Sequence, residues 1–184
     1  MNKPTTPPPI WLFLWAISGV SLILFQAIWK LFPLVMQLYT EHTLSIPQWL
    51  FLSIWVAFMG YTEGYRGFQK AFCPRVVARA WTLHTQAPFL HLLLAPLYSM
   101  GYFYATRKRK IVAWSITTGI VGIVIFVKIL PAPYRNIIDA GVVVGLTYGL
   151  TTLLVFTAQV LFGSPPTANP DLPESHTSPT MTSP

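Results

Sequence analysis

The sequence contains few charged residues and a single cysteine. Charged side chains make up 9% of the 184 residues, 5 of them acidic and 12 of them Lys or Arg; soluble domains contain about 25%. The single cysteine, Cys73, excludes an internal disulfide and a cluster of cysteines around a metal. We therefore do not expect an ordinary soluble domain. Nucleic-acid binding is not expected either, because no basic soluble domain remains to carry it.

Apolar residues are abundant instead. They make up 53% of the chain and gather in runs that approach the roughly 20 residues needed for a helix to cross a bilayer. The sequence predicts an all-α, polytopic transmembrane helical bundle over residues 10–162, between a disordered leader at 1–9 and a disordered Pro-, Ser- and Thr-rich tail at 163–184. Spans are expected at 10–29, 46–61, 111–130 and 137–162; the first can continue to 39 with a kink at Pro33, and the second continues in further helical turns to 68.

The number of spans depends on residues 87–105. This stretch is apolar and long enough to cross, but Pro96 near its middle favours a broken segment that re-enters or lies in the interface. If it does not cross, the basic stretches at 66–79 and 107–110 share one side, and 9 Lys and Arg face the cytoplasm against 3 outside. If it crosses, the numbers are 7 and 5. The positive-inside bias favours four spans with both termini in the cytoplasm over five spans.

An amphipathic helix is expected over residues 75–86. Arg75, Arg79, Thr82 and Gln86 fall on one arc of a helix, and mostly apolar residues cover the other side. This pattern is typical of a helix that lies along a membrane surface, although an ordinary packed helix remains an alternative.

Glu63 is an isolated acidic residue at the end of the second predicted span. On an α-helix it would lie one turn from Arg66, close enough for an ion pair, so we interpret it as structural. The alternative is a polar site for proton transfer or hydrolysis with His84 or His91. No nucleophile motif, zinc-protease motif or phosphate loop supports an enzyme, so no catalytic residue is assigned.

Two histidines on facing helices can ligate a haem, and a membrane bundle can hold one. We expect His84 at the surface, however, so a haem-bearing anchor is the less favoured hypothesis. The sequence therefore predicts no cofactor and no metal.

The basic residues are the strongest candidates for ligand binding. Together with Arg66 they could hold an anionic lipid headgroup or another anion at the cytoplasmic interface. The alternative is that they only set the orientation of the helices. The predicted set is Lys70, Arg75, Arg79, Arg107, Lys108, Arg109 and Lys110.

A ladder of small residues marks the last predicted span. Gly141, Gly145 and Gly149 recur every fourth residue and share one helix face, where backbones can approach closely in lipid. We expect the last two spans to pack as a hairpin through this ladder, with the small residues of the preceding span opposite it. Homodimerisation through the ladder is the alternative.

Three segments resemble those of small bacterial inner-membrane proteins that have no assigned activity. They are EGYRGF at 63–68, PRVVAR at 74–79 and DAGVVVGL at 139–146. The resemblance implies a bacterial plasma membrane and no particular reaction.

Taken together, these patterns predict a non-enzymatic accessory or assembly subunit that contacts membrane lipids, anionic ones among them, and partner helices. A homodimer is one form that such a partner could take. The alternative is a small transporter or membrane enzyme with a cytoplasmic-side site at Glu63, Arg66 and His84.

Overall fold

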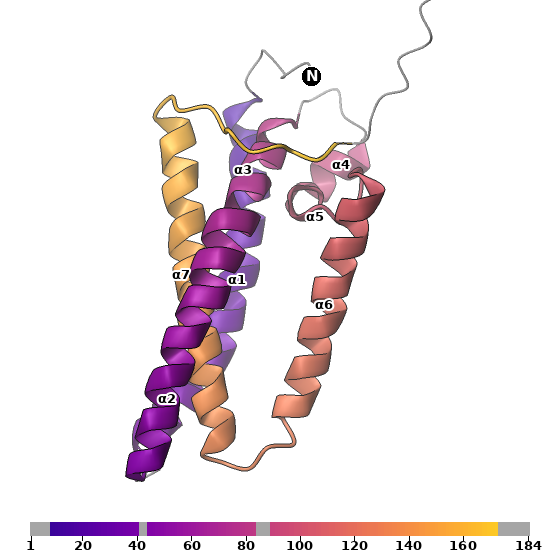
Figure 1. The fold of residues 1–184 in the computed structure, drawn as a ribbon. Helices are drawn as coiled ribbons and strands as arrows, with labels where there is room; N and C mark the ends of the chain where they lie inside the picture. The colour runs from indigo at the N-terminus through magenta and orange to yellow at the C-terminus, as the bar shows by residue number, and fades with distance from the viewer. Residues whose placement is uncertain (1–7, 41–43, 84–88, 173–184) are drawn as a thin grey trace, which may run out of the picture.

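The computed structural model describes residues 8–40, 44–83 and 89–172, and this part of the chain is helical without strands. Figure 1 shows the long helices roughly side by side, with the short helices gathered at one end. The elements are α1 (Ile10–Thr40), α2 (Ile46–Met59), the π-helix η1 (Gly60–Phe72), α3 (Cys73–Trp81), α4 (Phe89–Leu93), α5 (Ala95–Met100), α6 (Arg107–Val127) and α7 (Tyr134–Leu161).

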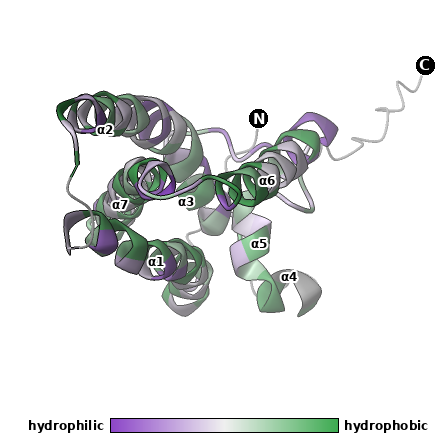
Figure 2. Ribbon diagram, turned by 90° about the horizontal axis from the view of Figure 1, so that it is seen from below, coloured by the Kyte–Doolittle hydropathy of each residue, from purple (hydrophilic) through white to green (hydrophobic). Residues whose placement is uncertain are grey.

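Three of the described helices are long and apolar enough to cross a membrane, namely α1, α6 and α7. Many large hydrophobic side chains of the long helices are exposed, among them Trp11, Phe25 and Ile120, and Figure 2 shows how common hydrophobic residues are along these helices. In water such a surface would be an aggregation liability, whereas lipid is its natural solvent. The prediction of an all-α fold is therefore confirmed, and the three long apolar helices are compatible with a multi-pass membrane protein.

A second long rod runs from α2 through η1 into α3 without a break. Pro47 lies in the first turn of α2, and Gln48 Oε1 accepts the Ser45 N–H at 2.9 Å, which stabilises the start of the helix. At the far end, α3 does not lie alone on a membrane surface. Val76, Val77 and Ala80 of α3 are packed in the main core. The packed alternative for this helix is thus the one found.

Residues 89–105 form two short helices instead of one long one. The backbone leaves the helical conformation at Leu94, and Gly101 ends α5 with a φ of 90°. Pro96 docks against Gly19 of α1, where an added β-carbon would lie 2.2 Å from Pro96 Cγ. The break predicted from Pro96 is present, and α4 and α5 lie at the same end of the bundle as α3 (Figure 1).

We call this end the basic end: it comprises α3, α4, α5, the first turn of α6, and residues 163–172, which we call the strap. The strap leaves α7 and crosses the end of the bundle (Figure 1). The carbonyl of Asp171 accepts the Thr106 N–H at 3.0 Å, and Leu172 packs against the main core. The sequence predicts a tail that is disordered from residue 163, and the strap makes these contacts without regular secondary structure; residues 173–184 and 1–7 lie outside the described residues.

The glycine ladder of α7 packs within the chain, as expected, but against a different helix. It contacts the α2–η1 rod, whose side chains lie directly over the glycines. An added β-carbon would lie 2.5 Å from the Trp55 ring at Gly141, 3.3 Å from Glu63 Cβ at Gly145, and 2.5 Å from the Phe68 ring at Gly149. The predicted hairpin contact is wrong, since Gly119 and Gly122 of α6 have no such neighbour within 4 Å among the described residues.

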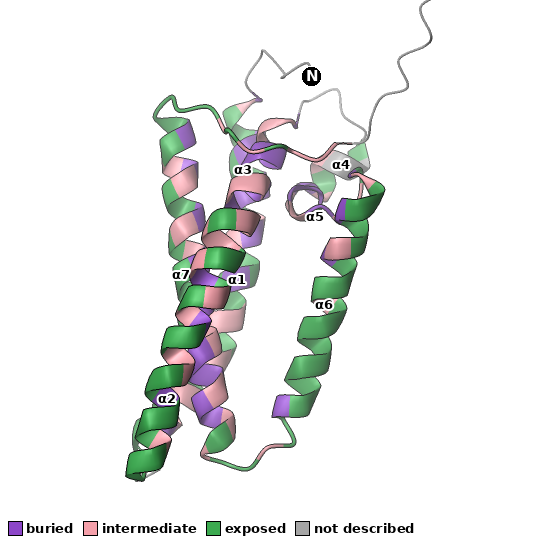
Figure 3. Cartoon of the chain, viewed as in Figure 1, coloured by how far each residue is buried: buried purple, intermediate pink, exposed green. Residues whose placement is uncertain are grey.

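Helix α6 stands apart from the other helices, and Figure 3 shows it exposed over most of its length. Its contacts are concentrated near its first turns, where Tyr102 Oη and Thr117 Oγ1 are 2.6 Å apart and the Tyr102 and Trp114 rings meet edge to face. Residues 118–126 are all exposed. Because this stretch covers more than two helical turns, the side that faces the bundle is uncovered as well.

Candidate functional site at the basic end

Arg79 lies at the centre of the basic end and is 0% exposed. Its guanidinium donates to the backbone carbonyls of five residues: Tyr98 (2.8 Å), Phe103 (3.1 Å), Tyr104 (3.1 Å), Pro170 (2.7 Å) and Asp171 (3.5 Å). It also stacks over the Tyr98 ring, 4.6 Å from the centroid. Arg79 therefore ties α3 to α5, to the loop before α6 and to the strap.

The environment of Arg79 explains how a charge is tolerated there. Burial lowers the pKa of the guanidinium, while Tyr98 and Asp171 raise it; an arginine stays protonated in either case. Its donors are occupied by carbonyls, so the cation is solvated by the protein backbone. The prediction that Arg79 contributes to a lipid-headgroup surface is wrong, because its guanidinium has no face left for a ligand.

Arg109 is the second buried cation, at 6% exposed. It follows the N-cap residue Thr106, whose hydroxyl accepts the Arg109 N–H at 3.4 Å, and its side chain packs against Gly101. Unlike Arg79, its guanidinium has no hydrogen-bond acceptor among the described residues, and its Nε is buried. Buried charged groups normally have a hydrogen-bond or ion-pair partner, so Arg109 is the candidate ligand-binding group at this end.

The other predicted cations are more accessible. Arg66, Lys70, Arg107, Lys108 and Lys110 are exposed, and Arg75 is partly exposed. Lys70 Nζ lies 4.7 Å from the centroid of the Tyr65 ring, and Arg75 Nε donates to the carbonyl of Ala71. The first turn of α6 carries four cations and no acid. Cations are unfavourable at the N-terminus of a helix, which carries a partial positive charge, so a bound anion would stabilise this turn.

Glu63 and Arg66 do not form the predicted ion pair. Both residues are described, yet the only ion pair within the described part of the chain joins Arg135 and Asp139, at 3.8 Å. The reason is the π-helix η1, whose hydrogen bonds run from i to i+5. Its wider turn rotates residues i and i+3 away from each other, compared with an α-helix of 3.6 residues per turn. Glu63 instead lies against Gly145 of α7.

The histidines of the alternative site are not placed. His84 lies outside the described residues, and His91 lies in α4 with its side chain outside the described part. Within the described residues no group of three His, Cys, Asp or Glu side chains gathers as a metal site would require. Cys73 is buried and donates from Sγ to the carbonyl of Gly149 at 3.4 Å.

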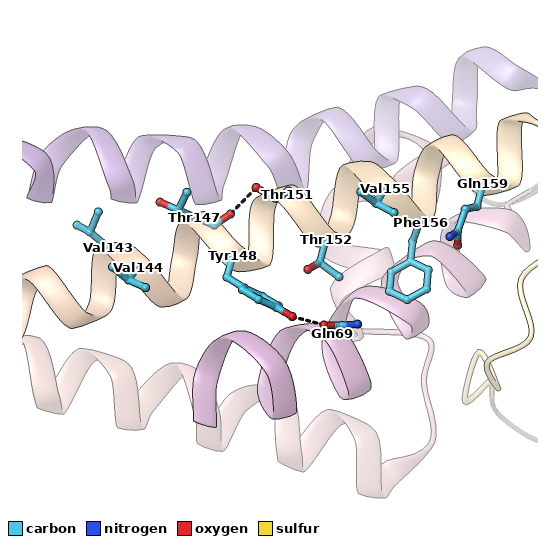
Figure 4. A pocket seen from close by; sticks show the side chains of 10 residues that line it. All are labelled: Gln69, Val143, Val144, Thr147, Tyr148, Thr151, Thr152, Val155, Phe156 and Gln159. Carbon is cyan, nitrogen blue, oxygen red and sulfur yellow. Dashed lines mark hydrogen bonds between the residues drawn. The ribbon is translucent and has the colours of Figure 1, made fainter. Parts of the chain in front are cut away.

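A groove of about 790 Å³ runs along α7 beside η1 (Figure 4). Tyr148 donates its hydroxyl to Gln69 Oε1 across the groove, and Thr151 donates to the carbonyl of Thr147. The Thr152 hydroxyl has no hydrogen bond among the described residues. The lining is Gln69, Val143, Val144, Thr147, Tyr148, Thr151, Thr152, Val155, Phe156 and Gln159.

Sequence reasoning missed the strap and the groove. The strap contributes backbone carbonyls, which any residue supplies, so no pattern of side chains in the sequence predicts its contacts. The groove has a weak signal, since Thr147, Thr151 and Gln159 recur on one face of an otherwise apolar helix. A comparison of the chain with family models, curated proteins and solved structures finds no match.

Proposed function

We propose that the chain is a four-span membrane protein whose basic end faces the cytoplasm of a bacterial cell. The α2–η1 rod supplies the fourth span, because the 14 residues of α2 and the 13 residues of η1 together exceed the roughly 20 that a bilayer requires. Residues 89–105 do not add a span in this arrangement. Their helices contain 5 and 6 residues, too few to cross.

The charge distribution supports the orientation. With residues 89–105 folded back at the basic end, the cations of η1 and α3 lie on the same side as those of the first turn of α6. Positive residues are retained on the cytoplasmic side during insertion, so this end is placed inside. Four cations lie elsewhere in the sequence: Lys3, near the N-terminus and outside the described residues, and Lys30, Lys128 and Arg135.

In this membrane we propose the role of a non-enzymatic accessory or assembly subunit that binds a helix of a partner protein. The observation that carries the proposal is the groove on α7, which presents hydroxyl and amide groups on a helix surface that otherwise meets lipid. From Val143 to Gln159 it is about 24 Å long at ~1.5 Å per residue, close to the thickness of the hydrocarbon core.

Hydrocarbon chains offer these polar groups no hydrogen-bond partner, whereas a neighbouring helix does. Interhelical bonds of this kind contribute about 0.6 to 2 kcal/mol each in membranes. Four groups in the lining have no hydrogen-bond partner among the described residues: the hydroxyls of Thr147 and Thr152, the side-chain amide of Gln159, and the amide nitrogen of Gln69. Glu63, exposed and without an ion-pair partner among the described residues, lies against the same helix and adds a carboxylate that a partner's cation would satisfy.

Site-specific photocrosslinking in native membranes tests the role. A photoreactive residue at Thr151, inside the groove, should give a discrete adduct with one partner protein. The same residue at Ile123, in the exposed stretch 118–126 of α6, serves as the control. The adduct should disappear when Thr152 is replaced by Val, which keeps the shape and removes the hydroxyl. Identical adducts from both positions, or an adduct indifferent to Thr152→Val, would refute the role.

A further inference from the structure

The strongest unexplained feature of the described residues is Arg109. The residue is 6% exposed, it is charged at every physiological pH, and its guanidinium, with a fully buried Nε, has no acceptor within the described part of the chain. A buried charge in this state is costly, and proteins remove the cost by pairing the group or by binding an ion.

The surroundings of Arg109 favour an anion. Arg75 and Arg79 lie near enough for their charges to repel it, and Asp171 is the carboxylate near enough to attract it. The N–H groups of Arg79 donate to backbone carbonyls, which carry no charge. The cluster thus holds three positive charges against one negative charge, and Arg75 still has Nη donors without an acceptor in the described part of the chain.

The surface of α6 that continues from this cluster is apolar. Beyond Arg109, residues 118–126 of α6 are exposed on every side, including the side that faces the bundle. Ile116, Ile120 and Ile123 are among its exposed apolar side chains. Membrane proteins do not leave such surfaces against empty space, since packing density in the bilayer is restored by acyl chains or by another helix.

We propose that Arg109, assisted by Arg75, binds the phosphate group of an anionic phospholipid whose acyl chains lie along the uncovered side of α6. The guanidinium suits a phosphate because its paired N–H groups match two phosphate oxygens. An anionic headgroup is preferred over a zwitterionic one, because the surplus of cations repels a choline or an ethanolamine. The proposal rests on the proposed function in one respect only, namely that the basic end faces an anionic leaflet.

Native mass spectrometry of the full chain in detergent tests the site, with phosphatidylglycerol and phosphatidylcholine added at equal concentrations. One phosphatidylglycerol should be retained at least tenfold more strongly than phosphatidylcholine. Arg109→Gln should weaken its retention by about tenfold or more, as expected for the loss of a charge-assisted bidentate bond. The matched control is Lys128→Gln, which removes an exposed charge at the other end of α6 and should change retention less than twofold.

Two further arms keep the proposal open to refutation. If Arg109→Gln lowers the amount of folded protein, Arg75→Gln decides the matter, because Arg75 is partly exposed and is not part of the core. Retention that falls no more in Arg75→Gln than in Lys128→Gln would overturn the site. Inorganic phosphate should neither stabilise the protein nor displace the lipid; stabilisation equal to that by phosphatidylglycerol would overturn the assignment to a lipid.

The lipid site and the proposed function fail separately. Lipid retention is measured in detergent and does not depend on which side of a membrane the basic end faces. Equal retention of both lipids with the groove adduct intact would refute the lipid site alone. Loss of the groove adduct with selective retention intact would refute the accessory role alone.

Discussion

Replacing Arg79 should be among the most damaging single changes at the basic end. Four of its five hydrogen bonds to backbone carbonyls are 3.1 Å or shorter, and they join segments far apart in the sequence. Arg79→Gln leaves most of these carbonyls without a donor. At about 1 kcal/mol for each carbonyl after partial rehydration, the free energy of unfolding should fall by about 4 kcal/mol. At about 2 to 4 °C per kcal/mol for a chain of this size, Tm should fall by roughly 8 to 16 °C.

Arg79→Lys separates the geometry of the guanidinium from its charge. A lysine keeps the charge but has three donors, so at least two carbonyls lose their partner and about 2 kcal/mol should be lost. The single cysteine supplies the assay, because Cys73 is 0% exposed and reacts with a thiol-reactive fluorophore only when the protein unfolds.

The control is Arg66→Gln, which removes an exposed arginine without ion-pair or hydrogen-bond partners among the described residues and should leave Tm unchanged within about 2 °C. A Tm for Arg79→Lys or Arg79→Gln equal to that of the control would show that Arg79 does not tie the basic end together.

Two further changes test the helix packing. Gly149→Ala should destabilise the protein by about 1 to 3 kcal/mol, because its β-carbon would lie 2.5 Å from the Phe68 ring. Gly119→Ala should be neutral or stabilising by up to about 1 kcal/mol, since nothing described lies within 4 Å of its β-carbon. Thermal unfolding of both variants checks this, and equal losses of stability would support packing of α6 against α7. Glu63→Gln should leave Tm within about 2 °C of wild type, and a double-mutant cycle with Arg66→Gln should show coupling below about 0.5 kcal/mol, because no ion pair joins them; coupling above 1 kcal/mol would mean that they pair in the membrane.

The helical architecture follows from signals that act locally. Apolar runs of bilayer length predict the helices α1, α6 and α7, and Pro96 predicts the break between α4 and α5. Each of these depends on the chain's own backbone hydrogen bonds and on proline chemistry, which a sequence displays directly.

The site depends on features that a sequence does not display. The π-helix η1 changes which residues share a face, so the spacing of Glu63 and Arg66 misleads. The charge of Arg79 places it on the polar arc of α3, yet its partners are carbonyls of the strap and of the loop before α6. The glycine ladder indicates close packing, but the identity of the opposing helix depends on which aromatic side chains fit, as Phe68 does at Gly149.

In the proposed four-span arrangement, both basic stretches lie on one side of the membrane. Lys70 and Lys108 are exposed representatives of the two stretches, and Ala132 lies in the exposed loop at the other end. A membrane-impermeant maleimide applied to single-cysteine substitutions at these positions tests the claim directly, because the native Cys73 is buried and stays silent. In intact cells, Ala132→Cys should be labelled while Lys70→Cys and Lys108→Cys are protected until the membrane is opened. Labelling of Lys70→Cys and Lys108→Cys from opposite sides would contradict the four-span arrangement.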